Sequence, residues 1–311
     1  MPKVTENLAY ENEFPTGVAT MAGELRTVTR GTRALLGVFV VLTAVATVAL
    51  YVFSGHTDRW FSWTIKPPLT AAFLGAGYAA GFVLVVLGLR ARSWAQARAA
   101  VVTVCVFATL TLLATLLHLD RFHFGADGTV ARFAAWFWLG VYVVVPVALV
   151  GLIARQQREP GADPERRDPV PSWLVAAFGL QGLVMGIVGA ALFVAPATAR
   201  TLWPWPLTPL TARVVAAWLI AFAVAAVLTV LERDLDRLAA GTVAYTVLGV
   251  LELLAVLRFS GEGRWDSTAG IGYLVVLVSV VPVGAAGWLA AARARRRPVP
   301  DATPAAAAPA G

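Results

Sequence analysis

The chain has 311 residues, of which 59% are hydrophobic and only 14% are charged, whereas a soluble domain carries about a quarter charged residues. This composition excludes an ordinary water-soluble protein. The formal net charge of +7 does not indicate nucleic-acid binding, because the basic residues flank apolar runs instead of forming one groove-sized patch.

The chain opens with a polar stretch, which predicts a disordered cytoplasmic N-terminal segment at residues 1–33. The runs that follow are long and almost free of charge. A helix needs roughly 20 apolar residues to cross about 30 Å of hydrocarbon, so these runs predict an all-α integral membrane protein with eight transmembrane helices. In chain order, the predicted helices occupy residues 34–57, 67–89, 99–119, 133–154, 169–199, 214–231, 238–257 and 267–292.

The eight helices are predicted to form two four-helix units joined by a charged, proline-rich cytoplasmic linker. The first unit covers 34–154, the linker 155–171 and the second unit 172–292, and a basic, then Ala/Pro-rich, disordered tail follows at 293–311. The single Cys105 lies in the third predicted helix and excludes an internal disulfide.

The two units are predicted to be copies of each other. Each contains 121 residues, and four short strings recur between them in the same order, at separations of 136 to 142 residues. Because each unit has an even number of helices, both enter the membrane from the same side, which predicts parallel, not inverted, repeats. The recurring strings are ALYV at 49–52 with ALFV at 191–194, PLTA at 68–71 and 209–212, RF at 121–122 and 258–259, and VVPV at 144–147 and 280–283.

The basic residues predict that both termini lie in the cytoplasm. Cytoplasmic loops carry the excess of basic residues, and 17 of the 25 Lys and Arg fall on the side that includes both termini. The richness in Ala, Val and Arg is typical of a bacterium with GC-rich codons, which indicates the inner or plasma membrane. Four tail arginines are predicted to contact anionic inner-leaflet lipids. They are Arg293, Arg295, Arg296 and Arg297.

Tryptophans precede each copy of PLTA. Trp60 and Trp63 come before the first copy, and Trp203 and Trp205 come before the second. Tryptophan is enriched where the membrane meets water, so these residues are predicted to be interfacial anchors. A shallow collar that contacts a ligand is the alternative interpretation.

Two prolines lie inside predicted helices. Pro146 and Pro282 each remove one backbone hydrogen bond and are predicted to kink the fourth and eighth helices. Matching kinks suit a shaped cavity or a hinge, although kinks also occur in membrane helices that have no moving part. The Gly182-x-x-x-Gly186 motif instead predicts close helix packing.

Polar residues inside the predicted helices form the candidate site. On the seventh helix, Thr242, Tyr245 and Glu252 lie along one stripe, since their spacings are close to one or two helical turns. The third helix carries a matching stripe. Together these stripes predict a polar seam that could bind a ligand or conduct an ion, and the residues that complete it are Thr111, Thr115, His118 and Gln181.

Glu252 is the strongest candidate within this seam. An ionisable side chain costs about 2.5–3.5 kcal/mol at a helix centre, so Glu252 is either a proton, cation or ligand site or a structural residue. The structural interpretation, in which Glu252 pairs with Arg258, His118 or a backbone group and fixes helix packing, is slightly favoured. The outer stretch with His118, Asp120 and His123 contains metal-ligand residue types, but the separation of five does not place the two histidines on one helical face, so no metal or other cofactor is predicted.

Three classes of function remain open. The chain is free of the common nucleophile, zinc-protease and nucleotide-binding motifs, so an enzyme is the least favoured class, and it would require outer-face His and Asp residues. A non-catalytic membrane component that packs against a partner protein, a second copy or lipid is the main alternative. A small secondary transporter with a seam around Glu252 is favoured, since an acidic residue inside the membrane suits a pathway.

Overall fold

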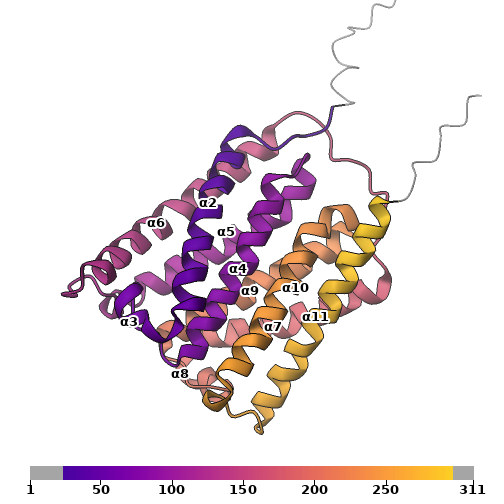
Figure 1. Cartoon of the computed structure of the whole chain (residues 1–311). Coiled ribbons are helices and arrows are strands. Elements are labelled where there is room, and N and C mark those ends of the chain that lie inside the picture. Colours follow the sequence, from indigo (N-terminus) through magenta and orange to yellow (C-terminus); the bar gives the residue numbers. More distant parts are fainter. Residues whose placement is uncertain (1–23, 297–311) are drawn as a thin grey trace, which may run out of the picture.

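The computed structural model describes residues 24–296, which form a helical bundle without β-strands (Figure 1). Eight of its helices are long and apolar enough to cross a membrane, which confirms the predicted class and indicates a multi-pass membrane protein. Every predicted span overlaps one of them. They are α2 (Arg30–Thr47), which continues into the π-helical turn Val48–Val52, α4 (Pro68–Leu89), α5 (Trp94–Leu116), α6 (Thr129–Arg158), α7 (Ser172–Val194), α9 (Pro209–Glu232), α10 (Leu235–Arg258) and α11 (Thr268–Arg295).

The starts of the long helices follow local sequence signals. Pro68 and Pro209 occupy the first turn of α4 and α9, where a missing N–H costs nothing, so the PLTA strings do begin helices. Asp234 caps α10 by accepting hydrogen bonds from the N–H groups of Asp236 and Arg237. Pro146 and Pro282 lie within α6 and α11, and both helices continue through them.

Helices α4, α5, α9 and α10 form the centre of the bundle. Helix α4 packs against α10, and α9 packs against α5, so the N-terminal and C-terminal halves of the chain interleave. The outer helices α2, α6, α7 and α11 cover this centre, and apolar side chains on their outward faces are exposed, among them Val41, Phe133 and Leu183. An exposed apolar face around the whole bundle is the surface that lipid chains would cover.

Both ends of the described chain lie at one end of the bundle, which we call the termini end, and we call the opposite end the far end (Figure 1). At the termini end, the Arg26 N–H donates to the Ala162 carbonyl at 3.0 Å, so the linker holds the segment before α2. Disorder was predicted up to residue 33, whereas in the structure residues 24–29 contact the linker, the α4–α5 connection and α6, and α2 begins at Arg30. Residues 1–23 and 297–311 lie outside the described part.

Aromatic side chains fill the far end. Trp63, Trp203 and Trp205 are buried, and the Trp205 indole donates to the Thr70 hydroxyl at 2.9 Å. The assignment of these three residues as interfacial anchors is therefore corrected, because they pack beneath the loops and present no face to lipid. Trp60 is 50% exposed, as expected for a tryptophan at the membrane interface.

Close contact between α7 and α9 depends on a glycine. A Cβ atom at Gly182 would lie 2.3 Å from the Cβ of Ala226, whereas a Cβ at Gly151 would meet no atom within 4 Å. We expect Gly182→Ala to lower the free energy of unfolding by about 1–3 kcal/mol, because the helices must move apart. Gly151→Ala is the matched control and should leave stability unchanged or raise it slightly. Thermal unfolding in nanodiscs measures both, and equal midpoints would contradict the expected clash.

Candidate functional site

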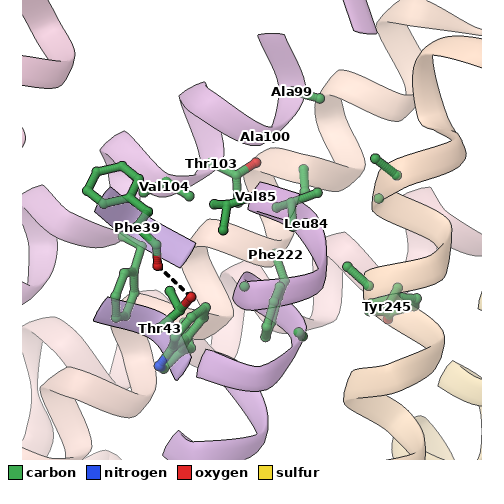
Figure 2. A pocket seen from close by; sticks show the side chains of 18 of the residues that line it. Phe39, Thr43, Leu84, Val85, Ala99, Ala100, Thr103, Val104, Phe222 and Tyr245 are labelled. Atoms are coloured by element: carbon green, nitrogen blue, oxygen red, sulfur yellow. Dashed lines mark hydrogen bonds between the residues drawn. The ribbon is translucent and has the colours of Figure 1, made fainter. Parts of the chain in front are cut away.

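A cavity of about 160 Å³ lies in the termini-end half of the bundle, and we call it the termini-end cavity. Seven of the eight spanning helices contribute to its lining. Figure 2 shows Thr103, Phe222 and Tyr245, which come from α5, α9 and α10, around the same space. Its deeper wall is aromatic: the Phe107 and Trp218 rings stack with centroids 3.9 Å apart. The shape and lining suit an apolar molecule.

A network of charged side chains closes the termini end above this cavity, and we call it the ionic network. Arg98 of α5 contacts Asp163 of the linker at 2.8 Å and also pairs with Glu232 at the end of α9. Arg237 of α10 contacts the same Glu232 at 2.6 Å and lines the cavity. Three helices therefore meet at the Glu232 carboxylate, and Asp163 joins the linker to them through Arg98.

A second cavity, of about 410 Å³, lies in the far-end half, and we call it the far-end cavity. Glu252 lines it and is only 2% exposed. Its Oε2 accepts a long hydrogen bond of 3.4 Å from the Tyr273 hydroxyl, and its Oε1 has no hydrogen-bond partner among residues 24–296. A buried carboxyl oxygen without a partner is costly, so this atom marks a position where a ligand group would be stabilising.

The two cavities share part of their lining. Met185 of α7 and Phe222 of α9 contact both of them, whereas Glu252 contacts only the far-end cavity. Two side chains near the middle of the bundle thus separate a space in one half from a space in the other.

The predicted polar seam divides into separate groups. The Tyr245 hydroxyl donates to Gln181 at 3.1 Å, and the Gln181 amide donates to the Ser279 hydroxyl at 2.8 Å, which links α10, α7 and α11. Within the described chain, no hydrogen bond connects Glu252 to these residues. Thr242 donates to the Ala239 carbonyl of its own helix.

The residues predicted on the third helix also lie apart from Glu252. Thr115 accepts a hydrogen bond from the Trp138 indole at 3.1 Å and donates to the Thr111 carbonyl, so Thr115 faces α6. The structure brings Tyr245 and Gln181 together, but among the described residues no hydrogen bond joins the two predicted stripes, because residues that match in sequence spacing lie on helices that turn them toward different neighbours.

His118 and His123 bind protein groups at the far end. The Nε2 atom of His118 lies 2.7 Å from Arg213, and burial, followed by the Arg213 charge, lowers the pKa of His118. The two ring nitrogens of His123 contact Thr64 and the Phe61 carbonyl. The part of the chain that the structure describes brings together no three His, Cys, Asp or Glu side chains that could hold a metal ion.

The geometry of the cavities is the basis for a functional assignment. No family model, curated protein or solved structure matches this chain. The far-end cavity with Glu252 is therefore the candidate site on chemical grounds, since it joins a large apolar space to one unpaired carboxyl group.

Sequence reasoning identified Glu252 but missed the ionic network. Glu252 is visible because it interrupts an apolar run. Arg98 and Glu232 lie at the ends of apolar runs and Asp163 lies in the linker, where charges are usual, and up to 134 residues separate them along the chain. Only the folded structure brings these charges together.

Proposed function

We propose that the chain is a secondary transporter for an apolar or amphipathic molecule, in which the termini-end and far-end cavities open alternately. The observation that carries this proposal is the shared wall: Met185 and Phe222 separate two cavities that lie in opposite halves of the bundle. A carrier needs a binding site that is accessible from one side of the membrane or from the other, but not from both sides at once. Movement of the outer helices around these two side chains would meet that need.

The ionic network supports the same mechanism as a closure of the termini end. Arg98, Glu232 and Asp163 hold α5, α9 and the linker together where the termini-end cavity would open. The Arg98–Asp163 pair is partly accessible to water and contributes modestly, so it can separate and form again during a transport cycle.

An internal duplication would supply matching halves for such a cycle. The outer helices pack alike, since α2 covers α4 as α7 covers α9, and α6 covers α5 as α11 covers α10. Two backbone hydrogen bonds of the first half also have counterparts in the second half. In each matched pair, the two donor residues are 141 residues apart in the sequence and the two acceptor residues are 142 apart. The matched pairs are Trp94 N–H to Arg26 O and Leu235 N–H to Asp168 O, both 2.8 Å, and His123 N–H to Ser62 O and Arg264 N–H to Pro204 O, both 2.9 Å.

The charge distribution orients this carrier. The excess of Lys and Arg supports a cytoplasmic position for the termini end and an inner or plasma membrane location. Arg293 and Arg296 are exposed at the end of α11, which supports the proposed contact with anionic lipid, while Arg295 contacts Asp236 at 3.2 Å. Arg297 lies outside the described residues.

Cysteine labelling tests alternating access without knowledge of the substrate. In a Cys105→Ala background, Ala99→Cys places a thiol in the termini-end cavity and Val276→Cys places one in the far-end cavity. Asp163→Asn removes the contact with Arg98. We expect it to raise the labelling rate at Ala99→Cys and lower the rate at Val276→Cys, each by about two- to fivefold, because one partly exposed ion pair is worth about 0.5–1 kcal/mol.

The labelling is measured with an impermeant thiol reagent on right-side-out and inside-out vesicles. Asp127→Asn is the matched control, since Asp127 is exposed and forms no ion pair in the described structure. Rates that stay constant at both positions, or that change in the same direction, would contradict transport. They would leave the chain as a static membrane component.

A further inference from the structure

We propose that the far-end cavity binds an amphipathic organic cation, which enters from the lipid layer between α7 and α11. The inference rests on the proposed function, because it names the substrate class of the same site. It commits to a positively charged nitrogen or phosphorus centre that carries apolar substituents.

The charge of the cavity supports a cationic ligand. Among residues 24–296, Glu252 is the only ionisable acidic or basic residue in its lining other than the Tyr273 phenol. The basic residues of the adjoining connection have other partners: Arg258 donates to the Tyr51 carbonyl, and Arg264 donates to the Trp203 carbonyl. A carboxylate without a protein cation in contact can offset its burial by pairing with a cation that the ligand brings.

The remaining lining suits the apolar part of such a ligand. Phe73, Trp203, Phe222 and Tyr273 contribute aromatic rings, and the rings of Trp203 and Tyr273 lie 5.6 Å apart between centroids. Aromatic faces attract organic cations and also pack against their substituents. The volume of about 410 Å³ falls within the range of small-molecule sites.

The opening faces the membrane. Val184 and Val188 of α7 line the cavity and are 37% and 36% exposed. On the α11 side, Gly272 lines it, and a Cβ atom built there would meet no atom within 4 Å. A molecule dissolved in the lipid layer could therefore reach Glu252 without first passing through a loop.

Helices α7 and α11 are held together away from this opening. The Gln181 amide donates to Ser279 at 2.8 Å, and Leu174 lies 3.6 Å from the position that a Cβ atom at Gly287 would occupy, both toward the termini end. The far-end parts of the two helices are joined by no hydrogen bond in the described chain. Among the described residues, no hydrogen bond therefore holds the rim of the cavity between α7 and α11 closed at the depth of Glu252.

Binding of two ions of the same shape tests the inference. Tetraphenylphosphonium and tetraphenylborate differ in the sign of their charge but have nearly the same size. We expect the purified wild-type protein in nanodiscs to bind labelled tetraphenylphosphonium at least about tenfold more tightly than tetraphenylborate, as measured by scintillation proximity. Glu252→Gln should abolish this preference, whereas Glu252→Asp should retain it, and the comparison with Asp keeps the test valid if the Gln variant folds poorly.

Access is tested at the rim of the cavity. Gly272→Trp should slow tetraphenylphosphonium association by about tenfold or more, because the indole would fill the opening between α7 and α11. Gly140→Trp is the matched control, since Gly140 is exposed and also has open space around its Cβ position. Equal association rates for the two variants would overturn lateral access.

The outcomes separate this inference from the proposed function. Equal binding of the two ions, or an unchanged preference in Glu252→Gln, would overturn the ligand class even if cysteine labelling showed alternating access. If the protein bound the cation selectively but Asp163→Asn did not change the two labelling rates in opposite directions, the proposed ligand class would stand and the proposed transport function would be contradicted.

Discussion

Trp205→Ala is expected to lower the free energy of unfolding by about 3–5 kcal/mol, the range for removal of a fully buried tryptophan. Trp205 is completely buried at the far end, and its ring packs against both Trp203 and Tyr273, with centroid distances of 5.1 Å to each. Its removal leaves a cavity among aromatic rings that are themselves packed against loops. It also leaves the Thr70 hydroxyl without its donor.

Reversible unfolding in mixed detergent micelles, followed by far-UV circular dichroism, measures this loss without depending on indole fluorescence. Trp60→Ala is the matched control, because Trp60 is half exposed and should cost less than about 1 kcal/mol. A similar loss for the two variants would mean that the far-end core does not depend on Trp205.

Glu232→Gln is expected to cost about 3 kcal/mol, since removal of one partner leaves buried charge uncompensated. Glu232 pairs with both Arg98 and Arg237, and the Arg237 side chain is 6% exposed, so little water reaches it to replace the carboxylate. The Arg98 side chain keeps some access to solvent, which places the cost at the lower end of the usual range for buried pairs.

The same unfolding measurement provides two comparisons for the ionic network. Glu159→Gln removes only the exposed pair with Arg155, at 3.8 Å, and should change stability by less than about 0.5 kcal/mol. Joint replacement of Glu232, Arg98 and Arg237 by methionine and of Asp163 by asparagine should recover most of the loss caused by Glu232→Gln, because all four charges that pair within the network are then removed. A Glu232→Gln variant as stable as the wild type would show that the two arginines do not need this carboxylate.

The helices could be predicted from the sequence because lipid imposes a length and a composition on each span. Helix ends were less predictable. Helix α6 extends to Arg158, although the predicted span ends at 154, because polar residues continue the helix beyond the apolar core. The burial of Trp63 and Trp205 was also missed, since a tryptophan near a membrane boundary has the same sequence context whether it faces lipid or the loops above the core.

The candidate site was predictable only in part. Glu252 stands out because charge is rare within a span, and the structure places it beside a cavity. Helix rotation decides which neighbour each polar side chain meets, and helical spacing alone does not determine that rotation between segments. Thr115 therefore meets Trp138, and Tyr245 meets Gln181, instead of joining Glu252.

The interleaved centre of the bundle has a consequence for biosynthesis. Trp218 of α9 packs against Gly77 of α4 and stacks on Phe107 of α5, so the principal neighbours of the early helices leave the ribosome more than a hundred residues later. Until α9 is synthesised, α4 and α5 lie in the bilayer without the partners that complete their packing. A nascent chain arrested after α6 should accordingly be a substrate for membrane proteases, even though all four of its hydrophobic segments have been inserted.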